Sequence, residues 1–359
     1  MSEKTLCETK VNNTSVHNKN LIIFPLIFLL VAVIGLFYVK WDPYYDRAFI
    51  AATTHSIGTS IITGKIAAAP APSWDAALGY ATAYFKAVWK AVVLGLLLGS
   101  LVQVLIPKHW VINVLGSQRF RSTAWAGVAS LPGMMCSCCA APVTVGLRER
   151  SASVGASLAF FLGNPVLNPA TIIFMGFVLS WEFAIFRIVA GLILVFGIST
   201  LANRLSGETI APSTMLKEEI SSLEGNALFS RWLQALGRLI IDTIPAYLII
   251  VFILGALRAW LFPVLGPEAG NSALAIIGLA VAGTLFVIPT AAEIPIIQTL
   301  MAFGLGVGPA AALLITLPAV SLPSLLIINR AFPKTILLFV VVSVVIIGII
   351  SGFVATAIL

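Results

Sequence analysis

The chain consists of long apolar runs separated by short polar breaks. The first run, 21–39, is long enough to cross a bilayer, which takes about 20 apolar residues in a helix. No small-residue cleavage site follows it, so we expect an uncleaved anchor helix, preceded by a polar cytoplasmic tail over 1–20. Residues 40–75 are mixed and complete an anchor-and-external region over 21–75. For the moderately apolar stretch 48–66 we expect an interfacial helix, with a true span as the alternative.

The remaining apolar runs predict two membrane units joined by a polar linker. The first unit covers 76–204 and contains a Pro- and Gly-broken segment over 122–147. The second covers 232–359 and contains a broken segment over 272–303. The residues between them, 205–231, predict a cytoplasmic linker. Strand-like alternation is absent, and helices satisfy their own backbone in lipid, so the pattern predicts an all-α polytopic membrane protein.

The two broken segments occupy matching places in the two halves. An offset of 153 residues superimposes Pro142 on Pro295 and Pro165 on Pro318. Broken apolar segments at corresponding positions are a sequence sign of a transporter-type site between two structural repeats. We therefore expect two repeats, although Pro and Gly are common in membrane helices and could also align by chance.

The amino-acid composition indicates that the chain is surrounded by membrane lipid. Of 359 residues, 59% are hydrophobic and only 10% are charged, with a mean hydropathy of +1.04. Soluble domains carry about 25% charged residues. This composition excludes a soluble enzyme, a disordered chain and a nucleic-acid binder, and it makes membrane lipid the surrounding partner. In such a protein the net charge of +7 reflects Lys and Arg in cytoplasmic loops.

The positions of these charges predict that the repeats are inverted. The turn after the first broken segment, 148–150, reads Arg-Glu-Arg, whereas the turn after the second, 301–303, carries no charge. If each broken segment enters and returns as a re-entrant hairpin, most loop cations fall on one face, as the positive-inside rule requires. We therefore expect two inverted-topology repeats, each with a broken re-entrant helical hairpin, and a cytoplasmic N-terminus. The cations that do not fit are Arg187, Arg258, Lys40, Arg47 and Lys65.

The first hairpin carries an unusual cluster of soft ligands. Met134-Met135-Cys136-Ser137-Cys138-Cys139 places three thiols and two thioethers in six residues. Non-helical backbone at membrane depth persists only where it is buried or lines a cavity, so we expect a substrate site here. The candidate binding residues are Met135, Cys136, Cys138 and Cys139. The alternative is that these cysteines are small, buried and inert.

Three polar residues of the second half are further candidates. Thr290 and Glu293 lie in the second hairpin, and Asp242 lies in the apolar helix predicted over 232–260. Because an intramembrane carboxylate is costly, we expect Glu293 and Asp242 to take part in proton coupling and Thr290 to bind substrate. The alternative for Asp242 is an ion pair with Arg238, four residues earlier on the same helix face.

Two amides flank a predicted helix break in the first half. Asn164 and Asn168 each precede a proline, and Asn-Pro-Ala occurs at 168–170. A water channel would need a second Asn-Pro-Ala, which the other half lacks, so we expect these amides to line the pathway or to satisfy freed backbone groups. No Walker A sequence, Ser/His/Asp set or H-E-x-x-H motif occurs. We therefore expect no enzyme, no catalytic residues, no cofactor and no resident metal.

The same residues carry a family resemblance. The stretch from Leu131 to Pro165, with Cys136-Ser137-Cys138 and Pro142-Val143, resembles the ArsP-type predicted permease family. The stretch from Ile288 to Pro323 is similar to that family's second repeat. The resemblance covers roughly 76–359 and implies a permease of the bacterial inner membrane.

The resemblance also implies a cargo. Characterised members export trivalent organoarsenicals such as methylarsenite, and their motif cysteines touch arsenic. This implies that Cys136, Cys138 and Cys139 bind a small trivalent arsenical here, although many members have glycine where this chain has Cys139. The interpretation is a proton-coupled efflux permease. A transporter of another thiophilic cargo (a sulfur compound or a soft metal ion), a channel and a redox enzyme remain alternatives, and a homo-oligomer is open.

Overall fold

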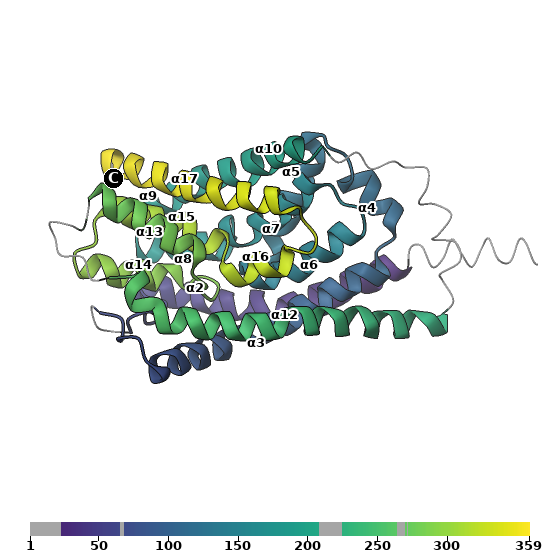
Figure 1. Ribbon diagram of the computed structural model, residues 1–359, viewed down its shortest axis with the longest axis horizontal. Helices are drawn as coiled ribbons and strands as arrows, with labels where there is room; N and C mark the ends of the chain where they lie inside the picture. The colour runs from purple at the N-terminus through teal and green to yellow at the C-terminus, as the bar shows by residue number, and fades with distance from the viewer. Residues whose placement is uncertain (1–22, 65–67, 208–224, 264–269, 271) are drawn as a thin grey trace, which may run out of the picture.

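The computed structural model describes residues 23–64, 68–207, 225–263, 270 and 272–359, and it is built from helices (Figure 1). Within these residues the only strand-like feature is an isolated bridge between Ser60 and Gly64. The predicted all-α fold class is therefore confirmed. The predicted tail over 1–20, with Cys7, lies outside the described residues.

Seven helices of the described chain are long and apolar enough to cross a bilayer. They are Ile23–Thr54, Trp74–Leu105, Val154–Val178, Trp181–Ser206, Leu228–Leu261, Val307–Ile328 and Lys334–Ile358. The long helices run along the long axis of the molecule (Figure 1). This arrangement satisfies the backbone of each span internally, as lipid requires, and makes the chain a multi-pass membrane protein.

The elements of the two halves follow one another in the same order. The first half contains α3 (Trp74–Leu105), α4 (Lys108–Leu115), α5 (Phe120–Ser130), α6 (Ser137–Glu149), α7 (Val154–Val166), α8 (Pro169–Val178), α9 (Trp181–Leu192), the π-helix Ile193–Ile198 and α10 (Ser199–Ser206). The second contains α12 (Gly225–Leu261), α13 (Ala273–Leu285), α14 (Glu293–Ala302), α15 (Val307–Ala319), α16 (Leu322–Ile328) and α17 (Lys334–Ile358).

Four helices start at the predicted offset. Helices α5, α7, α8 and α9 begin at 120, 154, 169 and 181, and α13, α15, α16 and α17 begin 153 residues later, at 273, 307, 322 and 334. Three candidate spans, an odd number, begin between the start of α3 and the start of α12. If each of them crosses the bilayer, the second half enters from the opposite face. The inversion of the repeats itself stays a prediction.

Each half also has two chain breaks at the places where prolines predicted them. Short helices flank the first break of each half, α5 and α6 in one and α13 and α14 in the other. The second break lies between α7 and α8, and between α15 and α16. Pro165 and Pro318 lie in the last turns of α7 and α15, where the missing N–H and the ring disfavour continuation of the helix.

The structure differs from expectation in the first helix. It does not end near residue 39 but continues through a π-helical turn, Phe37–Trp41, into α2, Asp42–Thr54. Pro43 lacks the N–H of a regular helical bond, and a π-turn is one way for a helix to accommodate such a defect. Residues 40–54 are therefore part of this helix, and a separate helical span over 48–66 is wrong, because the described residues 55–64 are not helical. The external placement of the region stays a prediction.

The predicted linker is also shorter than expected. Helix α12 begins at Gly225, inside the stretch 205–231, and α10 ends at Ser206. Residues 225–231, the end of the predicted linker, form the first turns of this long helix. Residues 208–224 lie outside the described part of the chain.

Glycines let α3 pack closely against α6, the helix that carries the cysteines. A Cβ at Gly95 would collide with the backbone carbonyl of Cys139, and one at Gly99 with the backbone of Pro142. Small residues spaced four apart are typical of close helix contacts in membranes. This contact fixes where α6 lies.

Candidate substrate site

The cysteines lie at the break of the first hairpin. After α5 a short 3-10 turn, Leu131–Gly133, leads to Met134, whose φ of 46° is left-handed. Cys136 then forms the N-terminal cap position of α6, and Cys138 and Cys139 lie in its first turn. All three thiols are buried and free of disulfides. Such a strained, non-helical connection inside a membrane protein is a frequent feature of functional sites.

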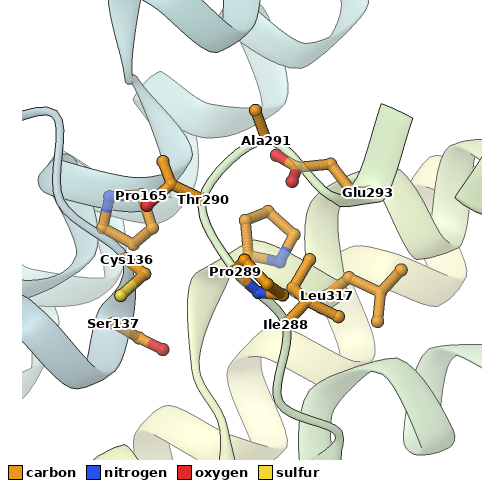
Figure 2. Close-up of a pocket in the computed structure, with 10 residues that line it drawn as sticks. Cys136, Ser137, Pro165, Ile288, Pro289, Thr290, Ala291, Glu293 and Leu317 are labelled. Carbon is orange, nitrogen blue, oxygen red and sulfur yellow. The ribbon is translucent and has the colours of Figure 1, made fainter. Parts of the chain in front are cut away.

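The break of the second hairpin faces this one. The loop between α13 and α14 contains Thr290 and Ala291, and Ala291 has a left-handed φ of 67°. Figure 2 shows Cys136 and Ser137 on one side and this loop, Ile288–Ala291, on the other, with Thr290 directed toward Cys136. Two breaks from distant parts of the chain therefore meet.

Cys136 and Cys139 form a thiol pair with two polar neighbours. They are three residues apart, which places them on one helix face, and the Cys136 thiol is within hydrogen-bonding reach of the Cys139 thiol and of the Thr290 hydroxyl. The Lys40 Nζ donates to Thr290 Oγ1 at 3.0 Å and to the Tyr44 hydroxyl at 3.2 Å. Lys40 acts electrostatically on both thiols. We call Cys136, Cys139, Thr290 and Lys40 the cysteine site.

Cys138 points to different neighbours. Its Sγ lies 3.3 Å from Ser321 Oγ, at the break between α15 and α16. It also interacts with the hydroxyls of Tyr84 and Tyr247, which are 2.6 Å apart from each other. The structure therefore brings Cys136 and Cys139 together and separates Cys138 from their polar partners.

A buried ion pair lies beside the cysteine site. The Arg187 Nη1 donates to Glu293 Oε1 at 2.7 Å, and both side chains are almost completely buried. Arg187 also donates to the carbonyls of Pro165 and Val166 at 2.8 and 2.9 Å. These carbonyls lie in the last turn of α7, where no intrahelical donor follows. Arg187 therefore connects the chain break between α7 and α8 in the first half to α14 in the second half.

Two cavities adjoin at Pro289, Thr290 and Ala291. The inner cavity, between Cys136 and Glu293, has a volume of about 10 Å³ (Figure 2), enough for about one water molecule. The outer cavity has a volume of about 520 Å³ and lies between α2, the segment 57–64 and α14. The cysteine site is thus closed toward a cargo-sized ligand, next to a cavity large enough to hold one.

The predicted amides and Met135 support the break. The Asn164 Oδ1 accepts from the backbone N–H of Met135 at 3.4 Å, and its Nδ2 donates to the Phe160 carbonyl at 2.9 Å. Asn168 caps α8, where its side chain accepts from the N–H of Thr171 at 3.3 Å. Both amides therefore serve freed backbone groups, one of the two roles expected for them.

Asp242 lies apart from these residues. It pairs with Arg330, at the end of α16, and not with Arg238 as the alternative expected. Its side chain is 49% exposed in the protein, whereas that of Glu293 is 2% exposed. Of the two predicted carboxylates, only Glu293 lines the inner cavity.

Three groups of candidate residues at this site are not predicted from the sequence. The pattern places Lys40 in an external segment, and Arg187 is only one of the cations that do not fit the charge pattern. Arg187 could have been found, because an arginine within an apolar helix is itself a sign of an intramembrane partner. The neighbours of Cys138, Ser321 with Tyr84 and Tyr247, carry no such signal.

Comparison with known proteins places the chain in a family. A family model described as a predicted permease matches residues 74–357. The chain belongs to this ArsP-type predicted permease family. It is a membrane transporter, and its membrane spans and the family together imply a small-molecule substrate.

Two curated relatives of the chain carry names without a stated cargo. The chain is 54% identical over 328 residues to UPF0718 protein YraQ of Escherichia coli, covering 91% of this chain and 93% of the relative. It is 25% identical over 320 residues to UPF0718 protein MJ0584 of Methanocaldococcus jannaschii, covering 71% and 88%. No solved structure matches. The helix that carries Lys40 precedes the part matched by the family model.

Proposed function

We propose that this permease is a secondary-active exporter of trivalent organoarsenicals of the methylarsenite type. The observation that carries the proposal is the buried pair of thiols, Cys136 and Cys139, at the place where the breaks of two hairpins meet. Trivalent arsenic is a soft centre that favours thiolate ligands. A pair three residues apart on one helix face can bind one arsenic atom through both sulfurs.

Binding by exchange balances without a redox step. Methylarsenite carries two hydroxyl groups on arsenic. As each thiol attacks, one As–O bond breaks, one As–S bond forms, and the thiol proton leaves with the hydroxyl group as water. Two waters are released when both Cys136 and Cys139 bind. Water reverses the exchange on the other side of the membrane, so the cargo is not trapped.

Alternating access supplies the movement that the closed site requires. The inner cavity of about 10 Å³ must open before methylarsenite can reach the thiols. Glu293 is the stronger candidate for proton coupling, since its Oε2 has no hydrogen-bond partner and it lines this cavity. Protonation would weaken its pair with Arg187 and loosen the link between the halves. Asp242 is a second candidate, on the half-exposed pair with Arg330.

The proposed orientation follows from the charges. In a bacterial inner membrane with a cytoplasmic N-terminus, the turn at 148–150 and the cations near Lys108, Arg330 and Lys334 share the cytoplasmic face. Inverted repeats then place the turn at 301–303 outside. The described residues of one chain form the cysteine site, so assembly into a homo-oligomer is not needed to complete it.

Uptake of methylarsenite into everted membrane vesicles tests the proposal. Wild-type protein should accumulate it, and an uncoupler should abolish the accumulation. Cys136→Ser and Cys139→Ser should each reduce uptake at least tenfold, and Cys138→Ser should reduce it less, since its thiol points elsewhere. Cys7→Ser, the same substitution far along the chain, is the matched control. Undiminished uptake by a well-expressed Cys136→Ser and Cys139→Ser double variant would reject the thiol role.

A sulfur-containing cargo is the second candidate. It uses the same thiols, and the buried ammonium of Lys40 beside them favours a cargo with negative charge. A soft metal ion is less well supported. In the part of the chain that the structure describes, no three His, Cys, Asp or Glu side chains gather at metal-binding distances.

A further inference from the structure

Lys40 is a buried cation with no carboxylate partner among the residues that the structure describes. Its side chain is only 4% exposed, and its described hydrogen bonds go to two neutral hydroxyls, of Tyr44 and Thr290. Asp42 and Asp46 are exposed on the same helix, and in the described residues neither forms an ion pair with it. A buried charge is costly unless it is compensated. An ammonium also has three donors, so one remains for another acceptor.

The outer cavity is lined by Thr290, the hydrogen-bond partner of this lysine, and its lining is positively charged. Arg47 and Arg258 line it, and none of its described lining residues is acidic. Arg258 is 7% exposed, its guanidinium stacks on the ring of Tyr80 at 5.4 Å from the centroid, and its Nε has no hydrogen-bond partner. A cavity lined by one sign of charge concentrates ions of the other.

Thr290 connects the two features. It lines both the outer cavity, with Arg47 and Arg258, and the inner cavity, with Cys136, and its Oγ1 accepts the hydrogen bond of Lys40. An anion that reaches Thr290 from the outer cavity is therefore next to the residues that contact Lys40 and Cys136. The one carboxylate of the inner cavity, Glu293, is neutralised by Arg187.

We propose that Lys40 makes this an anion site, so that the permease also accepts cargo that bears a negative charge beside the soft atom that contacts the thiols. The substrate class is a small anion with a thiophilic sulfur or arsenic atom. The oxygens of this anion accept from Lys40 and Thr290, and its soft atom lies against Cys136 and Cys139. The inference rests on the proposed cysteine site and adds an anionic cargo class to the neutral methylarsenite, which uses the thiols without needing the charge of Lys40. It also makes the first helix, which precedes the part matched by the family model, a specificity element of this chain.

Thiosulfate is the probe, because it is a dianion with a soft terminal sulfur and binds without bond exchange. Sulfate has the same charge and lacks the soft atom, and methylarsenite has the soft atom without the charge.

Full-length protein in proteoliposomes should take up thiosulfate, and sulfate should compete at least tenfold more weakly. Lys40→Met should raise KM for thiosulfate at least tenfold and should raise KM for methylarsenite by a clearly smaller factor, because methylarsenite carries no charge. Lys40→Arg should keep KM for thiosulfate within threefold.

Two further variants distinguish an effect of the lost charge on KM from a general effect on folding. Arg258→Met should raise KM for thiosulfate at least threefold, and Lys86→Met, which removes an exposed charge of α3, should not change it. Size-exclusion profiles establish folding. Absence of thiosulfate uptake by the wild type, an unchanged KM in Lys40→Met, or equal losses of both cargoes in that variant would overturn the anion site. Uptake that is insensitive to Cys136→Ser and Cys139→Ser would instead overturn the proposed cysteine site.

Discussion

Two of the buried cations that the structure describes, Arg187 and Lys40, are satisfied in opposite ways. Arg187 has a carboxylate and two backbone carbonyls as partners, so all of its contacts are internal. Lys40 has two hydroxyls and no carboxylate among the described residues. The first arrangement is that of a structural link. In the second arrangement, we propose that an anionic cargo supplies the negative charge that Lys40 does not receive from a described carboxylate.

The link between Arg187 and Glu293 can be measured directly. Removing one partner of a buried pair leaves an uncompensated charge and costs about 3–5 kcal/mol. We therefore expect Glu293→Gln and Arg187→Met each to lower the unfolding temperature of purified protein clearly. The double variant should lower the unfolding temperature by less than the sum of the two single effects, because no unpaired charge is left buried.

A matched control comes from the other described pair. Asp242→Asn breaks the half-exposed pair with Arg330, and exposed pairs contribute about 0–1 kcal/mol. It should shift the unfolding temperature little. Strictly additive effects of Glu293→Gln and Arg187→Met would contradict the link.

The sequence predicts the thiols and Thr290 as candidate site residues, but it does not predict which residues contact them. The thiols and Thr290 could be predicted because prolines mark both breaks and such backbone must line a cavity or be buried. Lys40 could not be predicted, since the apolar run stops at residue 39 and the sequence that follows is mixed. Which cysteines share partners also depends on packing: Cys136 and Cys138 are two residues apart and face different helices.

At the scale of elements, two glycines of α3 determine how closely α6, the helix that carries the cysteines, packs against α3. Gly95 and Gly99 face the backbone of α6, whereas Gly79, on the same helix, has no neighbour within 4 Å of an added Cβ. Close backbone approach is therefore required at the first two positions and not at the third.

This difference gives a prediction with an internal control. Gly99→Ala should push α6 away from α3, lower the unfolding temperature and reduce cargo uptake severalfold, because the Cβ would meet the backbone of Pro142. Gly79→Ala should be neutral or stabilising by up to about 1 kcal/mol, from the higher helix propensity of alanine. Thermal unfolding and vesicle uptake measure both. Equal behaviour of the two variants would show that the contact does not position α6.

At the scale of the whole molecule, the repeat could be predicted from a few prolines because the same breaks recur in both halves. The offset of 153 residues deduced from Pro142, Pro165 and their counterparts also relates the starts of four pairs of helices. The first helix and α12 could not be delimited in this way. Their ends depend on tertiary packing and on the water-exposed turns beyond the apolar core, which leave no periodic signal.

The orientation of the two halves can be tested by labelling. Glu149 and Phe303 are exposed residues in the turns that follow the two hairpins. With Cys7 replaced by serine, Glu149→Cys should react with a membrane-impermeant maleimide only in everted vesicles, and Phe303→Cys only in intact cells. The three native thiols are buried and should react slowly. Labelling of both new cysteines from the same side would contradict inverted repeats.

The most direct test of the cysteine site is the coordination of arsenic in the bound protein. Arsenic K-edge X-ray absorption of the purified full-length chain with one equivalent of methylarsenite reports which atoms surround the metalloid. We expect two sulfur neighbours in the wild type, fewer in Cys136→Ser or Cys139→Ser, and two in Cys7→Ser. A spectrum with oxygen and carbon neighbours alone, or one unchanged by loss of Cys136 and Cys139, would contradict the cysteine site.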